Sequence, residues 1–332
     1  MAAASFDVVG IGNAIVDVLA QTNDDFLAMH ELVKGAMTLI DEARGEMLYG
    51  AMGPGIEISG GSAGNTMAGI AALGGKGAFI GKVRDDQLGK IFRHDIRAAG
   101  VAFETTPATD GPTTGRCLVL VTPDAQRTMN TFLGAAVELT PDDLDEEAIR
   151  SAQVTYMEGY LWDPPAAKEA FLAAAKIAHG AGRKVSLSLS DPFCVARHHA
   201  SFLELVSGHV DVLFANEMEI CGLYQTKSFE GAVEQVRGHC EIAVLTRGEK
   251  GAVVLAGGET HVIEAEPAPD IVDTTGAGDL YAAGFLAGLT RDRPLYECGR
   301  MGAIAAAEVI SHIGARPETD LAALVRQRLH KA

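Results

Sequence analysis

The sequence predicts an α/β protein in which a mostly parallel central sheet is flanked by helices and carries a small β lid. Three observations favour this class. Short strand-like apolar runs alternate with helical runs from residue 140 onward, as in βαβ units. A glycine-rich turn precedes a buried helix at 273–289, and two apolar arms at 113–132 lie outside that rhythm. A chain of 332 residues can form one large domain with an appendage.

The first strand is expected at 6–12, a short apolar run that ends in glycine. The GIG string at 10–12 starts like a dinucleotide fingerprint, but Ile15 occupies its third glycine position, which argues against an NAD-dependent dehydrogenase. Asn13 and Asp17 are expected just past the strand end, where α/β proteins usually bind ligands. An aspartate there can accept two hydrogen bonds from a vicinal diol. Turn-forming polar residues are the alternative.

The lid is expected from two segments, at about 15–55 and 100–135, within one domain spanning 1–332. The first segment lacks a regular period apart from two short apolar runs. In the second, the turn PDA at 123–125 separates two arms, which is a hairpin signal. Arg127 on the second arm is placed to reach a bound anion, with a solvated strand arginine as the alternative. The two short runs lie at 33–40 and 55–59.

The string GGSAGNT at 60–66 is expected to open a helix that runs to about residue 73. Its glycines allow a ligand to approach the backbone closely, and close helix–sheet packing is the alternative. The remaining elements follow the βα rhythm. Strands are expected at 77–83, 154–158, 185–189, 210–214, 242–245 and 252–255, and helices at 86–99, 166–179, 202–206, 280–289 and 295–312.

The strongest chemical signal is DTTGAGD at 273–279. Gly276 and Gly278 leave backbone N–H groups free at the start of a buried helix, where unpaired N–H groups and the helix dipole favour an anion. Asp279 lies in the first turn of that helix. There it can take a proton from an alcohol that attacks phosphorus, or it can simply cap the helix.

Five strings in chain order resemble the ribokinase (PfkB-type) family of carbohydrate and nucleoside kinases, and the resemblance covers nearly the whole chain. It implies a ribokinase-like fold and ATP-dependent phosphorylation of a primary hydroxyl. Asp279 would be the base, and the amides of Gly276, Ala277 and Gly278 would form the anion hole. The five strings lie at 10–17, 60–65, 216–219, 246–251 and 273–279.

The same resemblance assigns the other site residues. It implies Mg²⁺, with Glu219 acting at the water shell of the ion, although Asn216 and Glu219 also have the spacing of a helix-capping pair. The segment 312–317 would close the adenine side and is a candidate site for K⁺. The turn at 246–251 would be a nucleotide loop or a simple hairpin. Substrate hydroxyls are expected at Asn13, Asp17, Gly60, Gly61, Ser62 and Asn65. ATP is expected at Asn216, Thr246, Gly248, Gly251, Thr275, His312 and Ala315, with Arg127 on a phosphate.

Within that family, four strings are similar to bacterial adenosine kinases, at 52–54, 60–66, 158–162 and 190–194. The expected reaction is transfer of phosphate from ATP to the 5′-hydroxyl of adenosine, with Asp17 on the ribose 2′- and 3′-hydroxyls. A ribokinase- or fructokinase-type sugar kinase is the alternative, because the diol contacts serve either substrate. A non-catalytic nucleotide-binding protein fits less well, since Asp279 is intact. Candidates for a wall against the purine are Leu39, Phe132, Trp162 and Phe193.

The composition restricts the partners. Lysine and arginine number 27 against 44 acidic residues, for a net charge of −17, which disfavours nucleic acid and anionic membranes. The five cysteines are widely spaced with no C-x-x-C pair, and we expect reduced, buried thiols. No Walker-type string is present, and no stretch is long and apolar enough to span a bilayer. We expect a cytoplasmic enzyme, monomeric or homodimeric, whose partners are ATP and one small molecule.

Overall fold

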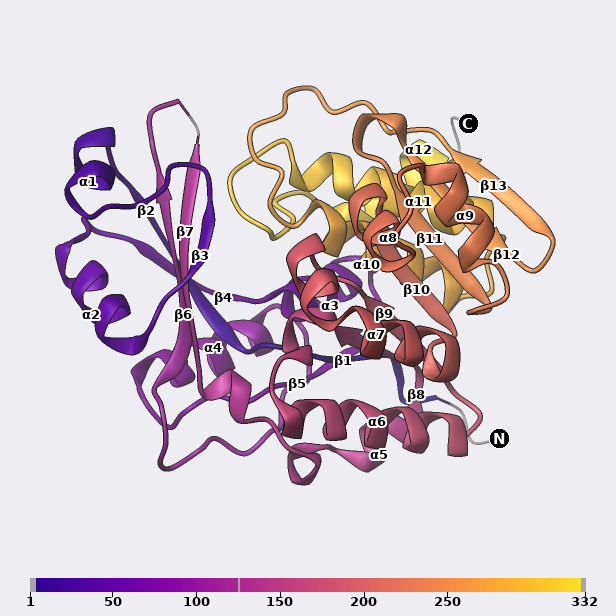
Figure 1. Ribbon diagram of the computed structural model, residues 1–332, viewed down its shortest axis with the longest axis horizontal. Coiled ribbons are helices and arrows are strands. Elements are labelled where there is room, and N and C mark those ends of the chain that lie inside the picture. Colours follow the sequence, from indigo (N-terminus) through magenta and orange to yellow (C-terminus); the bar gives the residue numbers. More distant parts are fainter. Residues whose placement is uncertain (1–3, 125, 330–332) are drawn as a thin grey trace.

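The computed structural model describes residues 4–124 and 126–329, and within them the chain forms two β-sheets (Figure 1). Ala125, in the predicted hairpin turn, lies outside the described residues. The larger sheet contains, from edge to edge, β13 (Glu259–Ile263), β12 (Ala252–Ala256), β11 (Ile242–Thr246), β10 (Val212–Asn216), β9 (Lys184–Ser188), β8 (Ala152–Glu158), β1 (Phe6–Ile11) and β5 (Gly77–Ile80).

The larger sheet is parallel from β5 to β11, and only the edge strands β12 and β13 run antiparallel to their neighbours. Its inner strands are buried along nearly their whole length, which is expected where helices cover both faces of a parallel sheet. The predicted α/β class with a mostly parallel central sheet is confirmed.

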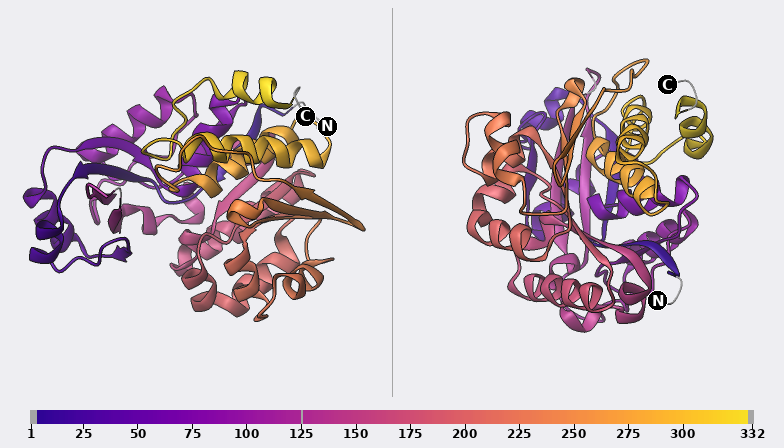
Figure 2. Two further views of the ribbon diagram at one scale, coloured as in Figure 1. Left: turned by 90° about the horizontal axis from the view of Figure 1, so that it is seen from above. Right: turned by 90° about the vertical axis from the view of Figure 1, so that its right-hand side faces the viewer.

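Helices cover both faces of the larger sheet (Figure 2). Successive residues of β1 serve different cores, because side chains alternate across a strand: Val8 belongs to the core on one face and Val9 to the core on the other. The first face carries α3 (Ser62–Ala72), α10 (Ala277–Leu289), α11 (Leu295–Val309) and α12 (Leu321–Leu329). The second carries α5 (Glu146–Ser151), α6 (Pro165–Gly180), α7 (Pro192–His209), α8 (Glu217–Leu223) and α9 (Phe229–Val236).

The smaller sheet lies beside the larger one, at the left of Figure 1. Its outer face packs against α2 (Glu42–Ala51) and α4 (Gln87–Ala98). The helix α1 (Asp24–Met29) follows β2, on the same side of the molecule. The predicted hairpin arms are confirmed as an antiparallel pair, β6 with β7. From edge to edge the smaller sheet contains β3 (Met37–Leu39), β7 (Arg127–Gly134), β6 (Thr114–Val121), β2 (Ile15–Gln21) and β4 (Ile56–Gly60).

The first 60 residues depart most from the expectation. The chain leaves β1, crosses at 12–14 and enters the smaller sheet as β2, so Asp17 lies within a strand and not in the turn after one. The helices α1 and α2 were not predicted. Asn23 and Asp41 cap them, but each buries only one or two side chains, and a helix without an apolar face leaves no period in the sequence.

Several later boundaries were also wrong. The helix α7 begins at Pro192, ten residues before the predicted start, because Asp191 caps it and a proline suits the first helical position. The helix α11 ends at Val309 and not at residue 312. The strand β13 and the helices α5, α9 and α12 were not predicted. The strand expected at 77–83 is shorter than predicted, since only its first four residues form β5.

All five cysteines are free thiols, as predicted, but Cys221 and Cys240 are only partly buried. Among the helices at 4–124 and 126–329, none combines the length and the apolar character needed to cross a membrane.

Candidate active site

A cavity of about 1540 Å³ lies between the two sheets. Its floor is formed at the carboxyl ends of the parallel strands, the usual position of ligand sites in α/β proteins. Its roof is the inner face of the smaller sheet. The strand ends contribute Asn13, Glu158, Ser188, Asn216 and Thr246, and all five residues line the cavity.

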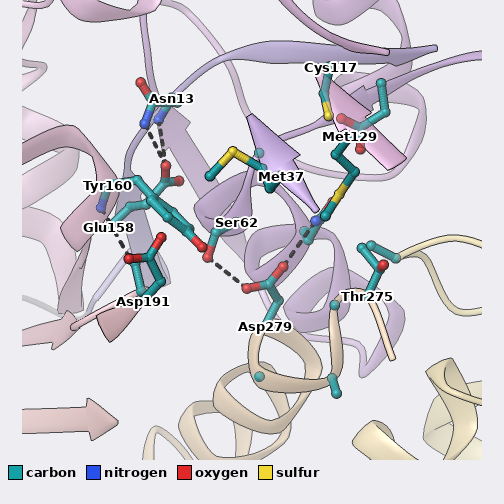
Figure 3. Close-up of a pocket in the computed structure, with 18 of the residues that line it drawn as sticks. Asn13, Met37, Ser62, Cys117, Met129, Glu158, Tyr160, Asp191, Thr275 and Asp279 are labelled. Atoms are coloured by element: carbon teal, nitrogen blue, oxygen red, sulfur yellow. Dashed lines mark hydrogen bonds between the residues drawn. The ribbon is translucent and has the colours of Figure 1, made fainter. Parts of the chain in front are cut away.

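Asp279 lies in the first turn of α10, on the cavity wall. The preceding Gly276 adopts the left-handed conformation with φ 78°, which glycine tolerates without strain. Ser62 Oγ donates to Asp279 Oδ1 at 2.6 Å, and Asn65 Nδ2 donates to Oδ2 at 3.0 Å (Figure 3). Burial raises the pKa of Asp279, and the two hydrogen bonds and the charge of Arg316 oppose that rise. The structure therefore holds a partly buried carboxylate at a helix N-terminus by two neutral donors.

The Gly60–Gly61 pair brings the start of α3 against the crossing from β1 to β2. A Cβ on Gly61, whose φ is +86°, would lie 2.1 Å from the carbonyl oxygen of Asn13. A Cβ on Gly60 would lie 2.3 Å from Asp17 Oδ2. Gly60 itself does not line the cavity, whereas Gly61 does. Burial raises the pKa of Asp17 to about 7, against the lowering effects of Arg316 and Arg127.

Glu158 is a buried carboxylate for which the sequence suggested no role. Its side chain is 1% exposed. Asn13 Nδ2 donates to Oε1 at 2.7 Å (Figure 3), and Ala63 N donates to Oε2 at 2.8 Å. Burial raises the pKa of Glu158 to about 7. The available signal was a glutamate at the carboxyl end of a buried strand, the same kind of position that favoured Asn13.

Two cavity-lining amides have an acceptor to spare. Within the described part of the chain, the Oδ1 atoms of Asn13 and Asn65 are buried and have no hydrogen-bond partner. Buried polar atoms are normally paired. These two oxygens can accept from hydroxyl groups of a bound molecule, as the expected sugar contacts require.

Asn216 and Glu219 form the capping pair that was the alternative interpretation. Asn216 caps α8 and donates from its backbone N to Glu219 Oε2 at 2.9 Å and from Nδ2 to Oε1 at 2.6 Å. Burial raises the pKa of Glu219 to about 7, and the negative charge of Asp191 adds to the rise. Both residues also line the cavity. Among the described residues no cluster of three metal-binding side chains exists.

The expected nucleotide residues divide between the cavity and its surroundings. Four of them line the cavity: Thr246, Gly248, Thr275 and Ala315. Ala315 lies against Gly276, because a Cβ added to Gly276 would be 2.7 Å from the Cβ of Ala315. Two others do not line the cavity. Gly251 ends the turn between β11 and β12, which is a hairpin. His312 Nε2 instead faces Glu308 Oε2 at 3.4 Å.

Arg127 reaches across the cavity from β7 to the 273–279 loop. Its Nη2 lies 2.7 Å from Asp273 Oδ2, and its Nη1 donates to Thr275 Oγ1 at 3.4 Å. Both members of the ion pair are nearly buried, with side-chain exposures of 9% and 3%. The guanidinium therefore stands beside the predicted anion hole.

The roof of the cavity is aliphatic and sulfur-containing. Of the four predicted wall residues, Leu39 and Phe193 line the cavity. Trp162 is buried between Phe171 and Phe202, and Phe132 lies on the opposite face of the smaller sheet, beside α2. The roof residues that sequence reasoning missed, three of them labelled in Figure 3, are Ile15, Leu19, Met37, Ile56, Ile58, Cys117, Val119, Met129 and Leu133.

Known proteins match this chain over nearly its whole length. The family model described as pfkB family carbohydrate kinase matches residues 57–321. The solved structure of a probable sugar kinase from Rhizobium etli is 52% identical, covers 98% of this chain and 99% of its own, and superposes with a TM-score of 0.92. That of adenosine kinase from Sinorhizobium meliloti is 52% identical, covers 98% and 100%, and gives 0.91. The adenosine kinase of Saccharomyces cerevisiae is 27% identical over 92% of this chain and 95% of its own length.

Proposed function

The chain belongs to the pfkB family of carbohydrate kinases, and we propose that it transfers the γ-phosphate of ATP to the 5′-hydroxyl of adenosine, giving AMP and ADP. Family membership makes it a phosphotransferase with an alcohol group as acceptor. The identity of the acceptor, adenosine, is the more specific part of the proposal. It is supported by the similarity to adenosine kinases and by the composition of the cavity wall.

The observation that supports adenosine as the substrate is the contrast between the polar floor and the apolar roof of the cavity. The floor offers the unpaired oxygens of Asn13 and Asn65, which suit ribose hydroxyls, and Asp17 on β2 of the smaller sheet lines the same cavity. The roof offers apolar surface, including Met37 and Leu39, which are 41% and 49% exposed. A purine gains free energy by covering such a surface, whereas a free sugar has little apolar area to place there.

The proposed reaction begins with the 5′-hydroxyl beside Asp279. The carboxylate takes the hydroxyl proton while the oxygen attacks the γ-phosphorus, and the bond to the β-phosphate oxygen breaks, so that ADP leaves. Ser62 and Asn65 hold the carboxylate in place through their hydrogen bonds. The amides of Gly276, Ala277 and Gly278, at the N-terminus of α10, would bind the transferred phosphoryl oxygens, the Ala277 N–H giving up its 3.3 Å bond to the Thr274 carbonyl, and Arg127 adds positive charge.

The residues present fit a magnesium ion held mainly through water and phosphate. Glu219 and Asp191 both line the cavity, and the charge of Asp191 adds to the raised pKa of Glu219, which is mainly due to burial. Both Glu219 oxygens already accept hydrogen bonds from Asn216, so a role at the water shell suits this pair better than direct ligation. Mg²⁺ bound with ATP supplies positive charge to the phosphoryl oxygens. Asp273 already has Arg127 as its positive partner, so no step is assigned to K⁺.

A sugar kinase is the second candidate, because a probable sugar kinase is also 52% identical to this chain. The test is ADP release from ATP and Mg²⁺ with adenosine, inosine, guanosine, ribose and fructose in parallel. Turnover with adenosine well above the sugars is expected. Preference for a free sugar would keep the mechanism and overturn the substrate. No turnover with any of them would overturn the proposed activity.

A variant of the roof separates the two candidates further. Met129→Gln keeps the side-chain volume but removes apolar contact, which we expect to raise KM for adenosine about tenfold (~1.4 kcal/mol) and to leave KM for ribose unchanged. Met47→Gln is the matched control, because Met47 is 42% exposed on α2 and does not line the cavity. Equal effects of Met129→Gln on both substrates would remove the roof from the binding site.

A further inference from the structure

Arg316 lies in the loop after α11 and lines the cavity beside Ala315. Its Nη1 donates to the carbonyl oxygen of Gly64 at 3.0 Å. Its Nη2 donates to the carbonyl oxygen of Ser59 at 2.6 Å and to Ser59 Oγ at 2.9 Å. One guanidinium therefore joins the C-terminal loop, the end of strand β4 in the smaller sheet and the first turn of α3.

The two contacted segments are those that hold Asp279. Ser59 and Gly64 flank the turn from β4 into α3. Ser62 lies between them and Asn65 directly follows Gly64, and these two side chains donate the hydrogen bonds to Asp279. Ser59 is itself 1% exposed. A shift of this corner would move both donors together, so the position of Asp279 depends on contacts that Arg316 makes.

Arg316 is also the positive charge that Asp17 and Asp279 share. Its charge lowers the pKa of each carboxyl, while burial raises the pKa of both, and the charge of Asp279 further raises that of Asp17. Burial lowers the pKa of Arg316, and the charges of Asp95, Asp17 and Asp279 oppose that fall. The other titratable groups that face the two carboxylates are Arg127, Cys117, Tyr156, Glu158 and Tyr160.

Asp95 fixes the other side of the corner. It lies on α4, behind the smaller sheet, and accepts from Ser59 N at 2.8 Å and from Ser59 Oγ at 2.5 Å. Ser59 Oγ thus donates to Asp95 and accepts from Arg316. This chain of bonds holds the guanidinium at one place against the cavity wall, which a flexible surface arginine would not achieve.

We propose that Arg316 is a positioning residue for phosphoryl transfer: it fixes the β4–α3 corner and supplies the charge that lets Asp17 and Asp279 be ionised together. The inference rests on the proposed roles of these two carboxylates. Asp17 and Asp279 line one cavity and their charges repel, so ionising both near neutral pH calls for a compensating cation. Arginine suits the role because its planar group donates in two directions and keeps its charge.

The test compares two substitutions that remove different properties. Arg316→Gln removes the charge, and we expect the acid limb of the pH profile of kcat/KM to move upward by about one pH unit. Arg316→Lys keeps the charge but cannot reach Ser59 and Gly64 together, so we expect a several-fold lower kcat with the acid limb in place. Arg291→Gln is the control, because Arg291 donates to the carbonyl of Leu73 at the other end of α3, away from the cavity.

A second readout does not require turnover. The thermal unfolding of the ligand-free protein, followed from pH 5 to pH 8, should show a steeper loss of stability with rising pH in Arg316→Gln than in the wild type or in Arg291→Gln. If all three profiles of unfolding coincide, the charge role of Arg316 is wrong even where the kinase activity stands. If the wild type fails to phosphorylate adenosine while the unfolding profiles differ, the proposed substrate fails and the charge role is kept.

Discussion

At the residue scale, Asp279 combines partial burial with fixed neutral donors. A carboxylate hydrated by bulk water would have its ordinary pKa near 4 and would be a weak base. Burial raises the pKa of Asp279, and the hydrogen bonds from Ser62 and Asn65 limit that rise without adding charge. The residue is thereby made more basic while its oxygens stay in one orientation.

Replacing Asp279 with asparagine tests the base directly. Asn keeps the size of the side chain but cannot accept a proton, so we expect kcat to fall about 10²- to 10⁴-fold while ATP still binds. Isothermal titration with a non-hydrolysable ATP analogue gives the second quantity. Asp145→Asn, which alters the cap of α5 far from the cavity, should leave turnover unchanged. Full activity of Asp279→Asn would exclude this mechanism.

The pH profile follows from the same environment. The active form of Asp279 is deprotonated, and its pKa is raised. The base is therefore lost as pH falls through that raised value, so the acid limb of kcat/KM should begin above the range of ordinary carboxyls. An acid limb at or below pH 4 would contradict this environment for Asp279.

At the element scale, Arg127 connects the two sheets. It comes from β7 in the smaller sheet and pairs with Asp273 on the loop before α10. The lid function predicted for this sheet requires such a contact, because a sheet that covers the cavity must be held to its floor. Backbone N–H groups of Thr275 and Gly314 donate to the same Asp273 carboxylate at 3.0 Å each, so Arg127 joins an already ordered loop.

Removing one member of this pair should cost more than removing both. Arg127→Gln leaves a buried carboxylate without its cation, and we expect the free energy of unfolding to fall by about 3 kcal/mol. The double variant Arg127→Gln, Asp273→Asn should recover part of that loss in urea unfolding, with a coupling of at least about 1 kcal/mol. Additive losses would show that the pair is not formed in solution.

The pair of Arg300 and Glu266, at side-chain exposures of 12% and 7% and outside the cavity, is the control for loss of a largely buried arginine. Arg300→Gln should lower stability less than Arg127→Gln, because Glu266 keeps Arg328, whose Nη1 lies 3.1 Å from Glu266 Oε1. Only the Arg127 variant should also lower kcat, by tenfold or more, because only Arg127 lies beside the proposed anion hole. A similar loss of kcat in both variants would assign the effect to stability alone.

Contiguous motifs were the predictable part of this site, because a short string fixes its own local geometry. The string at 273–279 placed Gly276 and Asp279 at a helix start, and the structure confirms that helix. The parallel strands were likewise readable from buried apolar runs. Arg316 was not predictable as a charge that acts on Asp17, because the two come to one cavity only when the C-terminal loop folds against α3. The apolar roof was not predicted for a related reason. Every second residue of a strand faces one side, so the residues that line the cavity follow the same alternating pattern as those that face a core.

At the scale of the whole molecule, four carboxyls that line one cavity, Asp279 among them, have raised pKa values. Burial is the main cause at Asp17, Glu158 and Glu219, and the pKa of each is raised to about 7. The ligand-free protein therefore holds these protons more tightly than the unfolded chain does. Substrate hydroxyls, Mg²⁺ and ATP are expected to offset the cost of ionising them, which links stability to occupancy of the site.

The sign of the resulting pH dependence is opposite to that of a salt-bridged carboxylate. A raised folded-state pKa contributes stability that is present below about pH 4 and is lost as pH rises toward 7. For Glu158 alone that loss is roughly 3 kcal/mol. Glu158→Gln should therefore unfold roughly 5 °C above the wild type at pH 8 and near it at pH 5 in scanning calorimetry of the ligand-free protein. Glu249→Gln, on the exposed β11–β12 turn, should leave the wild-type slope in place, and an unchanged slope in Glu158→Gln would mean that Glu158 is already ionised in the empty site.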